Sequence, residues 1–132
     1  MPAVTSAFVG LDALLETVAD DPWSLASDLA SASVLLRVAD RHKLRSERVS
    51  ELRGQAIAAL GMVARVQRPS GAFGYWRNGK SSPYVTAMVL DGLLEARAAG
   101  LRVPAKAIAK AAGFLAERMP KGLNHTYFGL GG

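Results

Sequence analysis

Residues 67–94, QRPSGAFGYWRNGKSSPYVTAMVLDGLL, contain the clearest signals of secondary structure in this chain. A helical pattern ends at its start, because the residue before Pro69 is pushed out of helical geometry. Residues 68–82 then form a loop that is rich in glycine and carries three aromatic side chains. Ser82 and Pro83 combine an N-cap residue with a proline at the first helical position, which predicts that a new helix begins there. Helix, short connection and helix in succession are typical of antiparallel helical hairpins.

Apolar residues spaced by three and four predict further helices on both sides of this loop. Asp21-Pro22 repeats the cap-and-proline signal, and Gly100 is a predicted C-terminal cap. The chain is therefore predicted to be all-α, a single helical domain or a fragment of one over residues 1–132. About five helices are expected, over residues 3–19, 22–42, 46–67, 83–99 and 104–118, with loop 68–82 and an irregular tail over 119–132.

The same spacing predicts which side of each helix is buried. On the second helix the predicted stripe is Leu25, Leu29, Ala32, Leu35, Leu36 and Ala39. On the third it is Val49, Leu52, Ala56, Ala59, Leu60, Val63 and Val66. On the fourth it is Val85, Met88, Val89, Gly92, Leu93 and Ala96, and on the fifth Ile108, Ala111, Ala112, Leu115 and Met119.

The amino-acid composition excludes several kinds of site. The chain has 132 residues, half of them apolar, and no cysteine, so disulfides, thiolate zinc sites and cysteine nucleophiles are excluded. No apolar run reaches the ~18 residues that a membrane-spanning helix needs. No basic region precedes the apolar stretch at the N-terminus, so the sequence does not predict a signal peptide. Two compartments stay open: the cytoplasm if the chain is complete as given, and the periplasm or cell envelope if it is part of a larger exported protein.

The loop and the helix after it resemble the thioester domain of the alpha-2-macroglobulin and complement family. That family has a glutamine, a Pro-x-Gly-x-Phe-Gly-x-Trp-like loop, a Ser-x-x-aliphatic-Thr-Ala helix start and a Leu-x-x-Ala continuation. The matching residues here are Gln67, Pro69, Gly71, Phe73, Gly74, Tyr75, Trp76, Ser82, Tyr84, Val85, Thr86, Ala87, Leu94 and Ala96. The resemblance covers about residues 11–118, and it implies that the helices are part of an α/α toroid.

The same resemblance points to a degenerate reactive centre upstream. The family motif Pro-Tyr-Gly-Cys-x-Glu-Gln-x-x-Ser opens a helix, and residues 22–31, PWSLASDLAS, occupy the equivalent slot. Leu25 then stands at the thioester cysteine, Ser27 at the glutamate and Asp28 at the glutamine. Without the cysteine and the glutamine no thioester can form, so covalent capture of a target is not expected.

The resemblance implies a non-enzymatic interaction or scaffold module, linked to protease inhibition or trapping, in a bacterial alpha-2-macroglobulin-like protein. This chain supplies about two and a half of the six hairpins of such a toroid, and open ends of a helical array expose apolar faces. The expected partner is a protein: a protease, the remainder of a larger parent chain, or a second copy in a homodimer. No catalytic residue, metal or cofactor is predicted.

Two alternatives belong to other classes. A fragment of a terpenoid cyclase or prenyltransferase-like toroid would need Asp91 to converge with Tyr75 and Trp76 in a cavity, and Phe73, Tyr75 and Trp76 could line such a pocket or simply pack in the loop. A nucleic-acid-binding protein would use the basic cluster between Arg37 and Arg48, but this cluster has no interleaved aromatic residues to stack on bases, which disfavours nucleic acid. His125 is predicted to be a surface loop residue.

Overall fold

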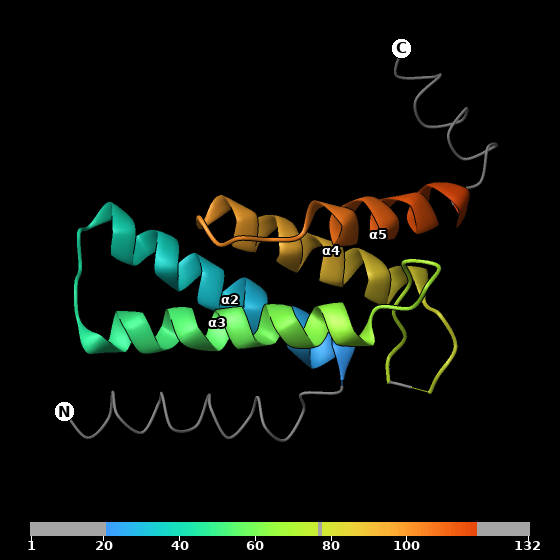
Figure 1. Ribbon diagram of the computed structural model, residues 1–132, viewed down its shortest axis with the longest axis horizontal. Helices are drawn as coiled ribbons and strands as arrows, with labels where there is room; N and C mark the ends of the chain where they lie inside the picture. Colours follow the sequence, from blue (N-terminus) through green and yellow to red (C-terminus); the bar gives the residue numbers. More distant parts are fainter. Residues whose placement is uncertain (1–20, 77, 119–132) are drawn as a thin grey trace, which may run out of the picture.

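A computed structural model describes residues 21–76 and 78–118 of the chain (Figure 1). In these ranges it contains four α-helices and no strand. They are α2 (Pro22–Arg41), α3 (Glu47–Val66), α4 (Pro83–Ala98) and α5 (Ala105–Arg118). The all-α prediction is therefore confirmed, and each of these helices begins and ends within one residue of its predicted range. The predicted helix over 3–19, the predicted tail over 119–132 and His125 lie outside the described residues.

The helices begin where the capping residues predict. The side chain of Asp21 accepts a hydrogen bond from Trp23 N at 3.0 Å, and that of Ser82 accepts one from Val85 N at 3.2 Å. Ser46 caps α3 in the same way, accepting from Val49 N at 3.4 Å. Each cap satisfies a backbone N–H that the first turn of a helix leaves without a partner.

The two central helices, α2 and α4, run in the same direction and pack side by side, with α3 against α2 and α5 against α4 (Figure 1). In an up-and-down four-helix bundle the first and third helices lie diagonally apart, whereas here they share the largest helix–helix interface. The described helices therefore form two stacked hairpins, α2–α3 and α4–α5.

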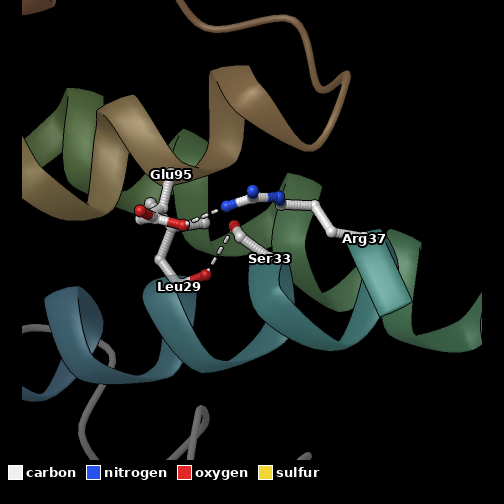
Figure 2. A network of polar contacts seen from close by, with 4 residues as sticks. All are labelled: Leu29, Ser33, Arg37 and Glu95. Atoms are coloured by element: carbon white, nitrogen blue, oxygen red, sulfur yellow. Dashed lines mark hydrogen bonds and ion pairs between the residues drawn. The ribbon is translucent and has the colours of Figure 1, made fainter. Parts of the chain in front are cut away.

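A glycine sets the separation between the two central helices. A Cβ added at Gly92 would lie 3.1 Å from the carbonyl oxygen of Ala26, so the absence of a side chain on α4 lets the α2 backbone come close. Further along, Arg37 on α2 forms a 3.0 Å ion pair with Glu95 on α4, and the buried Ser33 hydroxyl donates to the Leu29 carbonyl at 2.7 Å (Figure 2). The interface is thus apolar and closely packed inside and bridged by charges at its edge.

Two predicted core positions were wrong. Leu35 is exposed, because it lies on the side of α2 that faces neither α3 nor α4. Ala112 on α5 is also exposed, whereas Ala107 and Phe114 join Ala111 in the buried face of that helix. Helical periodicity marks apolar positions, but only the placement of the neighbouring helices decides which of them are covered.

The loop before α4 is tied to that helix by one buried residue pair. Thr86 Oγ1 accepts a hydrogen bond from Phe73 N at 3.0 Å and donates to Ser82 O at 2.8 Å. Ser82 N donates in turn to Phe73 O at 2.8 Å. Phe73 and Thr86 are both fully buried, so the Thr86 hydroxyl satisfies a loop N–H that water cannot reach.

We expect Thr86→Val to lower the free energy of unfolding by about 1–3 kcal/mol, because the change keeps the side-chain shape and leaves the buried Phe73 N–H unpaired. Urea unfolding followed by circular dichroism measures this. Ser33→Ala is the matched control: the Ser33 hydroxyl is equally buried, but it bonds a carbonyl of its own helix, so its loss should change stability by less than about 0.5 kcal/mol. Equal effects of the two changes would contradict the role assigned to Thr86.

Candidate functional site: an exposed aromatic cluster

The two central helices begin with the same three-residue pattern. Asp21-Pro22-Trp23 opens α2 and Ser82-Pro83-Tyr84 opens α4, each a capping residue, a proline and an aromatic residue. Because the helices run in the same direction, the two aromatic residues meet. The rings of Trp23 and Tyr84 stack with their centroids 5.5 Å apart and their planes 24° apart.

The loop adds two more rings. Tyr75 stacks on Trp23 with a centroid distance of 5.9 Å, and Trp76 lies beside Tyr75 at 6.2 Å. Trp23 is partly buried, but Tyr75 is 44%, Tyr84 60% and Trp76 67% exposed. We call these four residues the aromatic cluster. Together they place a surface of aromatic rings at the end of the molecule where α2 and α4 begin.

The aromatic residues predicted for this site separate into two groups. Tyr75 and Trp76 belong to the aromatic cluster, but Phe73 is fully buried in the core and cannot contact a ligand. Sequence reasoning missed Trp23 and Tyr84 as members. The repeated cap-proline-aromatic pattern could have indicated them, because it places Trp23 and Tyr84 at equivalent positions in the first helices of two successive hairpins.

Polar contacts hold the loop in the shape that presents these rings. The Arg68 guanidinium donates to Ser81 Oγ at 2.8 Å, to Trp76 O at 3.4 Å and to Gly79 O, and so joins the two sides of the loop. Gly79 leaves room for the indole, since an added Cβ would lie 2.7 Å from Trp76 Nε1.

The base of the loop is anchored to α5. Gln67 Nε2 donates to Ala107 O at 3.0 Å and to Gly71 O at 3.2 Å. Gly71 has a φ of +92°, and an added Cβ would collide with the carbonyl of Lys110 on α5. Only glycine suits this position, because it accepts the left-handed conformation and the close backbone contact together.

The predicted degenerate thioester slot lies in the first turns of α2, directly after Trp23. Leu25 is buried in the core, Ser27 is exposed and Asp28 is half-buried. Burial raises the pKa of the Asp28 carboxyl, and its Oδ2 is buried without a hydrogen-bond partner. The stacking of Trp23 on Tyr75 joins this slot to the loop, so the two segments on which the family resemblance rests are in contact.

The residues that a terpenoid cyclase or a nucleic-acid-binding protein would use do not form a suitable site. Asp91 is exposed on α4, so the acidic residue that a terpenoid cyclase would need does not lie in an enclosed cavity. Arg37 of the basic cluster is paired with Glu95, and the hollow at the α2–α3 turn mixes Lys43, Arg45 and Arg53 with apolar side chains. In the described part of the chain no group of histidine and acidic side chains could hold a metal ion, and no helix is long and apolar enough to cross a membrane.

Comparison with known proteins finds one informative similarity. An alpha-2-macroglobulin homolog of Yersinia pestis is 30% identical to this chain over 94 residues. The aligned part is 69% of this chain and 5% of that protein, so the chain corresponds to a small part of the relative. No family model matches the sequence, and no solved structure matches it. These findings support a distant relationship to alpha-2-macroglobulin homologs.

We expect Arg68→Ala to weaken the near-ultraviolet circular dichroism of the stacked aromatic rings while leaving the helical far-ultraviolet signal nearly unchanged. The reason is that Arg68 holds the loop that carries Tyr75 and Trp76, whereas the helices form without it. Arg65→Ala, which removes an exposed arginine from the last turn of α3, is the control and should change neither signal. A near-ultraviolet spectrum that is the same in Arg68→Ala as in the unmodified chain would contradict this account of the loop.

Proposed function

We propose that this chain is a non-enzymatic interaction module of a bacterial alpha-2-macroglobulin-like protein, and that it contributes to protease inhibition or trapping through non-covalent contact. The distant relationship to the Yersinia pestis homolog supports the family part of this proposal. The resemblance of residues 67–96 to a thioester-domain loop and helix supports the same part. A protein of this kind would act in the periplasm or at the cell envelope.

The observation that carries the interaction role is the exposed aromatic cluster. Tyrosine and tryptophan are enriched at protein–protein interfaces and dominate their binding energy, because they offer large rigid surfaces with a polar edge. A folded chain that had no use for such a surface would not be expected to leave three large rings of one cluster open to solvent. The loop contacts of Arg68 and Gln67 hold these rings in place before a partner arrives, which reduces the entropy lost on binding.

The proposed contact is non-covalent because the slot that corresponds to the reactive centre lacks the chemistry for a thioester. Leu25 and Asp28 replace the cysteine and the glutamine that would condense, and the Leu25 side chain is directed into the core. What that end of the chain offers in place of a reactive bond is the aromatic cluster, whose Trp23 immediately precedes the slot.

The arrangement of the helices supports a partial α/α toroid. Parallel central helices with antiparallel helices outside them are what an array of helical hairpins requires, and further hairpins could continue it at either end. The partner of the aromatic cluster would be a protease, or the remainder of a larger parent protein in which this array is completed.

The test measures binding of the fluorescently labelled chain to a panel of active-site-blocked endoproteases by fluorescence anisotropy. We expect micromolar or tighter binding to at least one protease, and we expect Trp76→Ala combined with Tyr84→Ala to weaken it about thirtyfold or more, the loss typical of interface residues worth 2 kcal/mol. Ile57→Ala, an exposed apolar residue on α3 outside the aromatic cluster, is the control and should bind like the unmodified chain.

Separate results would contradict separate parts of the proposal. A complex that survives boiling in detergent would show covalent capture. Binding that is equal in the double variant and in the unmodified chain would remove the aromatic cluster from the interface. The absence of binding to every protease at about 50 µM would contradict the link to protease inhibition.

A further inference from the structure

A hollow lies at the turn between α2 and α3, at the other end of α2 from the aromatic cluster (Figure 1). Its volume is about 720 Å³, which is within the size range of sites for small molecules. The last two turns of α2, the connecting residues and the first two turns of α3 all contribute side chains to it. We call this space the turn hollow.

The lining of the turn hollow has an excess of positive charge. Lys43, Arg45 and Arg53 line it together with a single carboxylate, that of Asp40, so three positive charges and one negative charge leave a net charge of +2. None of these four side chains forms an ion pair with another described residue. Neither glutamate in the first two turns of α3 is part of the lining. The charge of the hollow is therefore not neutralised by the described chain, and an anion would complement it.

The turn hollow also has an apolar part. Leu36 and Ala39 contribute buried surface to it from α2, and Val49 contributes from α3. Leu44 lies in the turn itself and is 56% exposed, so a large aliphatic side chain stands in water beside the cations. An inorganic anion would leave Leu44 exposed, whereas an anion with a hydrocarbon part would cover it and gain from the burial.

The backbone at Lys43 is unusual for a lysine. Its φ is +55°, in the left-handed region, at the position directly after the C-cap of α2, where glycine is the common residue. Hydrogen bonds from Lys43 N to Asp40 O and from Leu44 N to Ala39 O, at 3.1 Å and 2.8 Å, close the helix end in this shape. Glycine would fit this backbone with less strain, but it would remove one of the three cations from the turn hollow.

We propose that the turn hollow binds a phosphomonoester that carries a hydrocarbon chain. A phosphomonoester has a charge of about −1.5 to −2 at neutral pH, which complements the net charge of the lining. The guanidinium groups of Arg45 and Arg53 can each donate two parallel hydrogen bonds to phosphate oxygens, and Lys43 adds a third positive charge. The hydrocarbon chain would cover Leu44. This chemistry is shared by soluble alkyl phosphates and by lipids with a terminal phosphate headgroup.

The first experiment titrates the full ¹⁵N-labelled chain with hexyl phosphate and follows the amide signals by NMR. We expect saturable shifts centred on residues 43–53, with a Kd of about 1 mM or below. Inorganic phosphate and hexanol each carry only one half of the ligand, so each should bind about tenfold more weakly or worse.

Lys43→Gly separates binding from folding. Because glycine adopts the left-handed conformation without strain, the variant should unfold at a higher urea concentration than the unmodified chain. It should nevertheless bind hexyl phosphate about fivefold more weakly or worse, since a cation is lost from the hollow. A variant that is more stable and yet binds less cannot owe its weaker binding to misfolding.

Arg53→Gln is expected to weaken binding of hexyl phosphate about tenfold, because it removes a charged partner of the phosphate. Arg65→Gln is the matched control: Arg65 is an exposed arginine on the same helix, but it lies outside the turn hollow, so this variant should bind like the unmodified chain. Trp76→Ala combined with Tyr84→Ala should also leave this binding unchanged, so the test is independent of the proposed protease contact.

Vesicles distinguish the two sources of the phosphomonoester. If a lipid headgroup is the ligand, the chain should sediment with phosphatidylcholine vesicles that contain phosphatidic acid, and Lys43→Gly and Arg53→Gln should reduce the bound fraction. If a soluble phosphate is the ligand, hexyl phosphate should bind while neither these vesicles nor pure phosphatidylcholine vesicles carry the chain down.

Two results would overturn the proposal. The first is the absence of saturable shifts at residues 43–53 with hexyl phosphate at about 10 mM, far above the expected Kd. The second is equal binding by Arg53→Gln, Arg65→Gln and the unmodified chain, which would show that the anion associates with the basic surface in general and not with the turn hollow.

Discussion

The close parallel packing of α2 on α4 determines where the other described elements lie. Gly92 eases this packing where the α4 backbone meets the carbonyl of Ala26, because an added Cβ would lie only 3.1 Å from that oxygen. Once the two helices lie together in the same direction, their N-terminal ends must also lie together. The other two helices then lie on the outside of this pair. Helix α3 connects α2 to α4 and packs against α2, and α5 follows α4 and packs against it.

The aromatic cluster is a consequence of that packing. Trp23 and Tyr84 occupy the same position in two helices that begin alike, so parallel packing brings their rings into contact. The loop between α3 and α4 then adds Tyr75 and Trp76, and it is fastened from beneath by Phe73 and Thr86. An exposed surface is thus built on a buried anchor, which is how a rigid binding surface can be held on a small helical scaffold.

The residues predicted to form a degenerate thioester slot and the surface that we propose for binding are neighbours in this arrangement. Trp23 directly precedes the slot of Leu25, Ser27 and Asp28 along the chain and stacks on the loop across space.

Local features of this protein could be predicted from its sequence: the all-α class, the ends of the four described helices and most of the core. Asp21 and Ser82, each followed by a proline, and Ser46, which is not, act through hydrogen bonds and backbone angles within a few residues. Their effect can therefore be predicted without knowing the fold. Other features became visible only in the folded chain: Leu35 and Asp91 are exposed. Phe73 is buried apart from the aromatic cluster, whereas Trp23 and Tyr84 belong to it. The physical reason is that burial and contact depend on which helices become neighbours and in which direction they run, and helical periodicity carries no information on either.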